Sequence, residues 1–351
     1  RQMCIRDRNT CVWKSPQDSP LLSFMLTRIM HEAGLPNGVI NLIHGRGSGA
    51  GQFLVDSAEE GLLNKISFTG STPVGKMIGE VCGRNLVSCS LELGGKNPLV
   101  VMPSANIDNA VEGAYWAAFG TAGQRCTSLG NLIVHEDVYD EFMVKFMTKV
   151  KDTKIGDSLR HEDVLYGPML SEKYANDFLR DLGMCESDGA TKLWGEGMIT
   201  NDNKPANFLG DASEGVYMWP HVYADVTEDM HCFQEEIFGP VLSVVRVKTF
   251  EEAAKLINDH EYGNGVSIYT RDGDVGRTFA SKIQVGMVGI NVPIPVPMAF
   301  HSFGGWKRSL FGDSAMHGME GIKFYTKLKT VTSRWPSGIR SNAEFVMPTM
   351  K

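Results

Sequence analysis

The chain has 351 residues, of which 42% are apolar and 21% charged. This balance is typical of globular proteins and excludes long disorder, and the length predicts about two domains or one large α/β unit. The formal net charge is 34 − 41 = −7, without acidic or basic blocks, so we expect no nucleic-acid or anionic-membrane partner. The longest apolar runs, such as residues 99–102, are far shorter than the ~20 residues that cross a bilayer.

The seven cysteines are odd in number and contain no Cys-x-x-Cys spacing, so they do not indicate a disulfide framework or a zinc site. The His-Glu pairs that begin at His31 and His161 lack the second His that a helical zinc motif has four residues after the first. We therefore expect a cytoplasmic protein without a bound metal.

The first eight residues, RQMCIRDR, have neither the apolar core of a signal peptide nor an amphipathic period. Regular patterning begins at Asn9. We expect residues 1–8 to be a non-native leader and set them aside in predicting the fold.

From residue 9 onward, short apolar segments alternate with amphipathic ones. Ser19 and Pro20 begin a helix that Gly34 ends, with apolar residues at helical spacing from Leu22. Further helices are predicted from Gln52 and over residues 72–81. The predicted strands of this block are residues 10–14, 39–43, 65–68 and 98–102. Such alternation predicts parallel βαβ units in a doubly wound sheet.

The alternation continues in a second block. Its predicted helices are residues 107–118, 138–150 and 249–258, and its predicted strands are residues 129–134, 241–247, 266–269 and 285–291. Residues 152–230 carry little pattern. Residues 324–332 alternate apolar and polar side chains, which predicts an exposed strand able to complete a neighbour's sheet in an oligomer.

Two glycine segments are candidates for binding a dinucleotide. Residues 45–50, GRGSGA, match G-x-G-x-x-A, but the acidic residue expected about 20 positions on is missing because position 65 is Lys. Residues 68–71, FTGS, end a strand and open a helix, where Gly70 lets a phosphate approach the free N–H groups beside Ser71. We favour the second, although an ordinary Ser N-cap has the same local pattern.

Two further segments carry chemical groups. Glu92 lies in an apolar run before a double-glycine turn, in LELGGKNP, and Cys126 follows Gly123 on a helix-to-strand turn, in GQRC. Alone, such a Cys is mostly structural and such a Glu mostly a solvated charge. Together with a phosphate turn they supply a nucleophile, a general base and a nucleotide site, which aldehyde oxidation through a thiohemiacetal and a thioester requires.

With these motifs, residues 9–335 resemble the NAD(P)-dependent aldehyde dehydrogenase superfamily. The motifs are FTGS at 68–71, LELGGK at 91–96, GQRC at 123–126 and EEIFGP at 235–240, and the 34 positions from Glu92 to Cys126 match the family's interval. The resemblance implies an α/β fold with an incomplete, doubly wound parallel-sheet NAD(P)-binding domain at 9–93 and an α/β catalytic domain at 94–300. It further implies a return segment with an oligomerisation strand at 301–340 and a tail at 341–351, in a homodimer or homotetramer.

The resemblance also implies catalytic roles. Cys126 resembles the nucleophile, and Glu92 resembles the base that releases the product. Because the thiolate is the reactive form, we expect a lowered thiol pKa, caused by adjacent Arg125 and by the cofactor's nicotinamide. Asn97 receives no role.

For the cofactor, Lys14 resembles the ligand of the adenosine ribose, with Gly70 and Ser71 at the pyrophosphate. Glu236 and Phe238 resemble the ribose ligand and the packing residue at the nicotinamide. Gln17 stands where the family usually has an acid. An acid at this position would repel the 2′-phosphate of NADP, whereas neutral Gln17 does not. The choice between NAD and NADP therefore stays open, with NAD slightly favoured.

Residues 292–297 and 302–307 resemble the methylmalonate-semialdehyde dehydrogenase branch, which uses CoA and lacks an acid at the position of Glu92. The presence of Glu92 favours release of a free acid, with CoA acylation as the alternative. Arg125 resembles the residue that binds a substrate carboxylate in members that use semialdehydes. A structural ion pair or a solvated side chain remains the alternative for Arg125.

The family carries a further segment before this one, which includes an Asn whose amide binds the oxyanion. We therefore expect the chain to be a fragment, and a non-catalytic scaffold is the alternative function. A cysteine hydrolase is disfavoured because Cys126 has no recognisable His partner.

Overall fold

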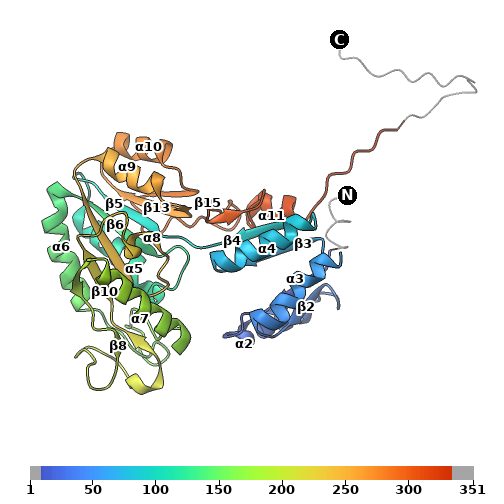
Figure 1. The fold of residues 1–351 in the computed structure, drawn as a ribbon, viewed down its shortest axis with the longest axis horizontal. Coiled ribbons are helices and arrows are strands. Elements are labelled where there is room, and N and C mark those ends of the chain that lie inside the picture. Colours follow the sequence, from blue (N-terminus) through green and yellow to red (C-terminus); the bar gives the residue numbers. More distant parts are fainter. Residues whose placement is uncertain (1–8, 334–351) are drawn as a thin grey trace, which may run out of the picture.

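The computed structural model describes residues 9–333, which form an α/β fold. Figure 1 shows β3, β4 and α4 beside α11, with α2, β2 and α3 below them and the largest sheet with its helices on the left. No helix among these residues is long and apolar enough to cross a membrane. No cluster of three His, Cys, Asp or Glu side chains in residues 9–333 is placed to hold a metal ion.

The N-terminal part contains two small sheets. Strands β1 and β2 pair in parallel, and β4 lies between β3, which is parallel to it, and β16, which is antiparallel. The elements are β1 (Cys11–Lys14), α2 (Pro20–Glu32), β2 (Ile40–Ile43), α3 (Gln52–Glu59), β3 (Lys65–Thr69), α4 (Thr72–Arg84), β4 (Ser88–Glu92), β16 (Leu310–Phe311) and α11 (Gly318–Phe324). The predicted helices and strands of this block, and the parallel pairing of its strands, are confirmed.

Helix α2 begins after Ser19 as predicted, but its apolar side is not covered. Leu22 and Ile29 are 65% and 55% exposed, whereas the buried residues are Ser23 and Thr27. Helical spacing of apolar residues therefore predicted the helix, but not the side of it that packs.

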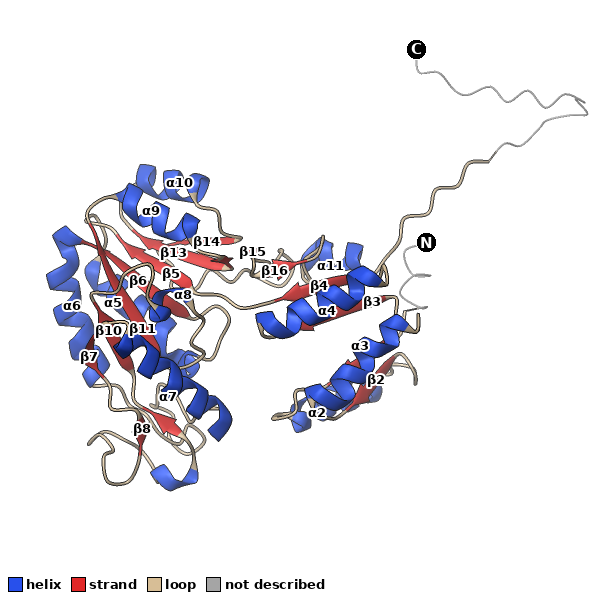
Figure 2. Ribbon diagram, viewed as in Figure 1, coloured by secondary structure: helices blue, strands red, loops and turns tan. Residues whose placement is uncertain are grey.

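The second part is built on a seven-stranded sheet within residues 97–290. Its order is β14-β13-β5-β6-β11-β10-β7, and β7 alone is antiparallel to its neighbour. Its strands are β5 (Asn97–Val101), β6 (Leu129–His135), β7 (Thr191–Trp194), β10 (His221–Ala224), β11 (Val241–Val247), β13 (Gly265–Tyr269) and β14 (Met287–Ile290). Figure 2 shows these strands among blue helices, in keeping with the predicted parallel-sheet architecture.

The helices of this part connect its strands. They are α5 (Ile107–Phe119), α6 (Glu136–Lys151), α7 (Glu172–Ser187), α8 (His231–Gln234), α9 (Phe250–Asp259) and α10 (Gly273–Lys282). Two short pairs, β8 (Met198–Ile199) with β9 (Tyr217–Met218) and β12 (Tyr262–Gly263) with β15 (Trp306–Lys307), complete the described elements. Helices α5 and α6 meet through Phe119, Phe142 and Phe146, whose fully buried rings stack.

The prediction of a strand over residues 324–332 is wrong. Phe324 is the last residue of α11, and residues 326–333 belong to no strand. The physical reason is tertiary: Phe324 is buried, its ring lies 4.4 Å from the Lys65 ammonium, and an alternating segment becomes a strand only beside a sheet edge. Residues 334–340 of the predicted return segment, the predicted tail 341–351 and the predicted leader 1–8 lie outside the described residues.

One turn of this fold depends on glycine. Gly123 has φ +66°, and an added Cβ would collide with the backbone carbonyl of Gly239. We expect Gly123→Ala to lower the free energy of unfolding by at least about 1 kcal/mol, since neither backbone can yield cheaply. Urea denaturation followed by circular dichroism measures this.

The matched control is Gly183→Ala within α7, where an added Cβ meets nothing within 4 Å. This variant should gain about 0.5–1 kcal/mol from helix propensity. Equal stabilities of the two variants would contradict the assigned collision.

Candidate active site

The double-glycine turn at Gly94 and Gly95 brings distant residues together. The Gly95 N–H donates to Glu236 Oε1 at 3.0 Å. A Cβ on Gly94 would strike the Glu236 carboxylate, and a Cβ on Gly95 would lie 2.8 Å from the Cys126 carbonyl oxygen. The turn therefore needs glycine because the other two segments occupy the space of its side chains.

Glu92 ends β4 directly beside the predicted phosphate turn. In the parallel pairing, Thr69 lies opposite Glu92, and the Gly70 N–H donates to the Glu92 carbonyl at 3.0 Å. The Glu92 side chain is 5% exposed, and its buried Oε1 has no hydrogen-bond partner within the described residues. Burial raises the pKa of Glu92 to about 7, which suits a base that works near neutral pH.

Cys126 follows a short helical turn, Gly120–Gly123, in which Thr121 and Ala122 adopt left-handed conformations. Burial raises the pKa of its thiol, and so do the nearby carboxylates of Glu236 and Glu92, whereas a hydrogen bond with Asn264 lowers it. Gly95 links Cys126 to Glu236, because it packs against the Cys126 carbonyl and donates its N–H to Glu236. Glu92 is in turn joined to the turn at Gly70 through its carbonyl.

The expectation that Arg125 lowers the pKa of the thiol is not borne out. The Arg125 guanidinium lies 4.9 Å from the centre of the Trp116 ring, and the dominant charges acting on Cys126 are negative. Within residues 9–333, Arg125 forms no ion pair, so the ion-pair alternative also lacks support. Its charge stacks on an aromatic face and keeps its donors free for an anion.

A small pocket collects three of the predicted residues. Arg125, Glu236 and Phe238 line it together with Gly95, and Phe238 is 39% exposed. Burial raises the pKa of Glu236 to about 7, opposed by the hydrogen bond from Gly95 and by Lys96. The cavity thus combines a positive charge, an aromatic ring and a carboxylate close to Cys126.

The structure pairs Lys14 with the glycine segment that the sequence made the weaker candidate. Lys14 Nζ donates to the Gly45 carbonyl at 3.4 Å, and a Cβ on Gly51 would lie 3.6 Å from Lys14 Cδ. Gln17 is exposed after β1. Lys14 and residues 45–51 therefore form one surface, separate in sequence from the 70–71 turn.

Ser71 occupies the N-cap position of α4, but its side chain makes no capping hydrogen bond. The ordinary N-cap explanation thus lacks the bond that defines it. The first N–H groups of α4 have no side-chain acceptor there, which leaves them available to an anion. Thr72, the next residue, hydrogen-bonds the Tyr262 hydroxyl at 3.0 Å and so ties α4 to β12.

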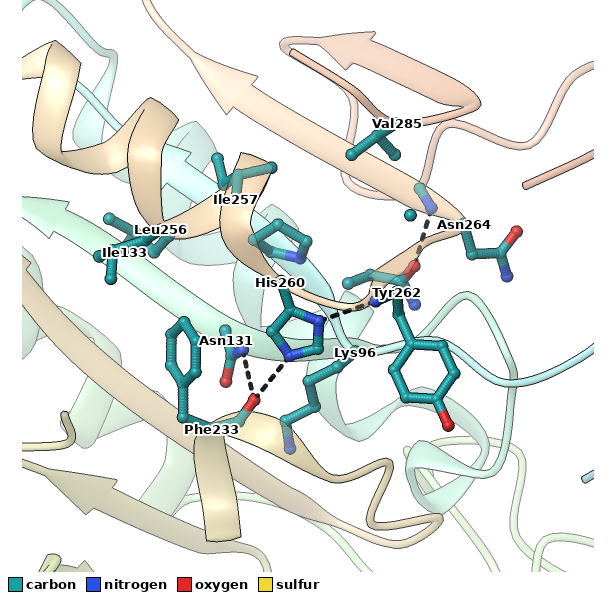
Figure 3. Close-up of a pocket in the computed structure, with 14 residues that line it drawn as sticks. Lys96, Asn131, Ile133, Phe233, Leu256, Ile257, His260, Tyr262, Asn264 and Val285 are labelled. Atoms are coloured by element: carbon teal, nitrogen blue, oxygen red, sulfur yellow. Dashed lines mark hydrogen bonds between the residues drawn. The ribbon is translucent and has the colours of Figure 1, made fainter. Parts of the chain in front are cut away.

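A second pocket contains Lys96, the residue that follows the Gly94–Gly95 turn. Figure 3 shows Lys96 among Phe233, His260 and Tyr262. Lys96 is 5% exposed, and burial lowers its pKa. Sequence reasoning missed Tyr262 and Asn264 because YGNG carries no recognisable local pattern. It noticed Asn97 only as part of a motif.

The comparisons with known proteins fit this geometry. The model of the aldehyde dehydrogenase family matches residues 3–331, a match that begins inside the eight residues set aside as a leader. The chain belongs to the aldehyde dehydrogenase family.

Among curated relatives, the chain is 39% identical to malonate-semialdehyde dehydrogenase of Pseudomonas aeruginosa, over 97% of this chain and 67% of that protein. It is 37% identical to malonate-semialdehyde dehydrogenase of Bacillus cereus, over 93% of this chain and 64% of that protein. The chain thus spans about two thirds of the length of these relatives.

Among solved structures, a putative methylmalonate-semialdehyde dehydrogenase of Sinorhizobium meliloti complexed with NAD matches with a TM-score of 0.86 and 38% identity, over 94% of this chain and 65% of that one. Betaine aldehyde dehydrogenase of Staphylococcus aureus in complex with NAD⁺ matches with a TM-score of 0.83 and 30% identity, over 90% and 60%. Both confirm the fold and the predicted family, and the first, with the curated relatives, also confirms the predicted branch.

The raised pKa of Glu92 has a consequence for stability. A carboxyl group with a pKa of about 7 when folded and 4.5 as its ordinary value binds its proton more tightly in the folded state. It therefore lowers stability increasingly as the pH rises from 4.5 to 7. We expect Glu92→Gln to gain about 2–3 kcal/mol over the wild type at pH 7, and to lose that gain towards pH 4.5.

Urea titrations at several pH values measure this difference, with Glu162→Gln as the control. Glu162 is exposed, so its replacement removes no buried charge and should not reproduce the gain. A pH-independent effect of Glu92→Gln would show that the carboxyl group is not buried as described.

Proposed function

We propose that this chain forms the catalytic part of an NAD(P)-dependent aldehyde dehydrogenase that oxidises a carboxylate-bearing semialdehyde to the acid. The observation that carries the proposal is the placement of Cys126 beside Glu92 and Glu236, next to the turn at Gly70. Relatives named as malonate-semialdehyde dehydrogenases, 37–39% identical to the chain, support the substrate class.

In the proposed reaction, the Cys126 thiol releases its proton to solvent and Sγ adds to the aldehyde carbon to form a thiohemiacetal, with the backbone N–H of Cys126 as the proposed donor to the oxyanion. Loss of hydride converts this adduct to a thioester. Glu92 then takes a proton from a water molecule, whose oxygen bonds to the acyl carbon as the C–S bond breaks. The acid leaves and the thiol regains its proton.

The residues present fit a dinucleotide. The uncapped start of α4 at Ser71 and the small Gly70 suit a pyrophosphate, Lys14 suits the adenosine ribose, and Glu236 and Phe238 suit the nicotinamide end. NAD⁺, when bound, accepts the hydride. Gln17 is the proposed residue at the 2′ position, where its neutral amide favours NAD weakly and leaves NADP open.

Arg125 is the proposed ligand of the substrate's distal carboxylate. Its guanidinium is held on Trp116 and lines the cavity that Glu236 and Phe238 share. A planar fork of donors binds two carboxylate oxygens, and the stacking contact fixes its orientation.

We further propose the domain boundaries given by the resemblance: a partial NAD(P)-binding domain at 9–93, a catalytic domain at 94–300 and a return segment at 301–340. A homodimer or homotetramer is the proposed assembly, by analogy with the family. The six described cysteines are all free, which supports a reducing compartment such as the cytoplasm.

The nucleophile is tested with Cys126→Ala. We expect this variant to lose NADH formation from malonate semialdehyde and to lose acylation by p-nitrophenyl acetate, because both reactions need the same sulfur. Absorbance measures the first, and intact-protein mass spectrometry measures the second. Cys11→Ala, at an exposed cysteine, is the control and should behave as wild type.

The reaction of Cys126 with p-nitrophenyl acetate needs no dinucleotide. Acylation of Cys126 without NADH formation would favour the non-catalytic alternative for a chain of this length. Acylation at other cysteines only would contradict the assignment of Cys126.

The base is tested with Glu92→Gln. We expect a normal first-turnover burst of NADH and a steady-state rate lowered by about 10²–10⁴-fold, since only thioester hydrolysis needs the base. The wild-type steady-state rate should fall as the pH drops below about 7, where Glu92 becomes protonated. A steady state that requires CoA and is unchanged in Glu92→Gln would establish the CoA-acylating alternative instead.

A further inference from the structure

The carbonyl oxygen of Cys126 accepts two hydrogen bonds from side-chain amides. Asn97 Nδ2 donates to it at 2.8 Å, and Asn264 Nδ2 donates to it at 3.0 Å. Both asparagines are buried, with 5% and 3% exposure. A carbonyl oxygen has two lone pairs, so the two amides saturate this one.

Asn97 holds more than this one carbonyl. Its amide nitrogen also donates to the Ser128 carbonyl at 2.9 Å, and its Oδ1 accepts the Gly265 N–H at 2.9 Å. Three of its four hydrogen-bonding positions are thus spent on backbone groups. Asn97 therefore joins the loop that carries the nucleophile to the first residues of β5 and β13.

Asn264 contacts Cys126 at two points. Besides donating to the carbonyl, its side-chain amide lies close enough to the Cys126 thiol to lower the pKa of that thiol, against burial and the two carboxylates, which raise it. Its Oδ1 is buried and has no partner within the described residues. Burying an amide oxygen without a hydrogen-bond donor lowers stability. The position of Asn264 is therefore explained by the hydrogen bonds that its N–H groups donate.

Gly95 packs against the clamp. A Cβ on Gly95 would lie 2.8 Å from the Cys126 oxygen, 3.1 Å from Asn264 Cβ and 3.2 Å from Asn97 Oδ1. The backbone of Gly95 therefore lies directly against all three groups and limits how far the loop can shift towards it.

We propose that Asn97 and Asn264 are positioning residues of the nucleophile, forming a two-amide clamp that fixes the peptide after Cys126 and directs its sulfur. Asn97 holds the shape of the loop, and Asn264 holds the loop and the sulfur together. Fixing this peptide fixes the backbone from which the side chain of Cys126 projects, and a nucleophile displaced by about 1 Å loses on the order of 10²-fold in rate.

Because Cys126 as the nucleophile is itself a proposal, the test uses a thiol reaction that needs no turnover. Wild type, Asn97→Ala and Asn264→Ala are alkylated with iodoacetamide across pH 6–11, and modification of the peptide that contains Cys126 is followed by mass spectrometry. The midpoint of the pH profile reports the thiol pKa, and the plateau at high pH reports access to the sulfur.

We expect Asn264→Ala to move the midpoint upward by about one pH unit, which lowers the rate at pH 7 about tenfold. Asn97→Ala should leave the midpoint in place and raise the plateau at least about threefold, because the released loop exposes the sulfur. A general loss of stability would not shift the midpoint in one variant and raise only the plateau in the other.

The matched control is Asn131→Ala. Asn131 is 1% exposed, and its amide likewise donates to a backbone carbonyl, that of Phe233, at 3.0 Å. Figure 3 shows Asn131 beside Phe233, well away from Asn264. This variant should lose stability while keeping the wild-type midpoint and plateau.

Circular dichroism establishes that each variant is folded at the temperature of the assay. Should Asn264→Ala fail to fold, Asn264→Asp preserves the size of the side chain and should raise the midpoint further by charge repulsion. The clamp would be overturned if the Asn97 and Asn264 variants had the same alkylation midpoint and plateau as Asn131→Ala. That result would leave the dehydrogenase proposal standing, since p-nitrophenyl acetate tests that separately.

Discussion

The site depends on the close approach of the Gly94–Gly95 turn to two other segments. One glycine leaves space for the Glu236 carboxylate, and the other leaves space for the carbonyl of Cys126. The same turn links β4 to β5. Glu92 therefore precedes the turn and Asn97 follows it, each two residues from a glycine. A side chain at either glycine would separate the groups on which the proposed chemistry relies.

Burial gives this site its electrostatic character. It raises the pKa of Glu92 and of Glu236 to about 7, and it lowers the pKa of Lys96. In a dry environment the neutral forms are favoured, so each group changes charge closer to neutral pH than it would in water. The thiol is disfavoured as a thiolate by both carboxylates, and Asn264 is the neighbour that opposes them. Burial raises the pKa of the thiol more than either carboxylate does, so the amide of Asn264 acts against all three.

Elements with a strong local signal were predictable from the sequence. Strand β11 spans residues 241–247 as predicted, and the helix predicted over residues 249–258 forms as α9, where the N-cap Thr249 accepts the Glu252 N–H. Elements that depend on distant contacts were not. Helix α7 lay in a segment without clear pattern, β16 has two residues and exists by pairing with β4, and Phe324 ends a helix because it packs on Lys65. Alternation alone could not reveal that last contact.

The amino-acid sequence by itself determined the chemical groups and their order: a thiol at Cys126, an acid at Glu92, a small turn at Gly70, and the α/β alternation between them. Only the tertiary structure decided which groups touch. It placed Arg125 on Trp116, Lys14 against Gly45, and two amides on one carbonyl. The physical reason is distance along the chain. Asn264 and Cys126 are 138 residues apart, and Gly265 and Asn97 are 168 apart. Contacts of such separation form only when parallel strands align, and no local pattern of residues encodes them.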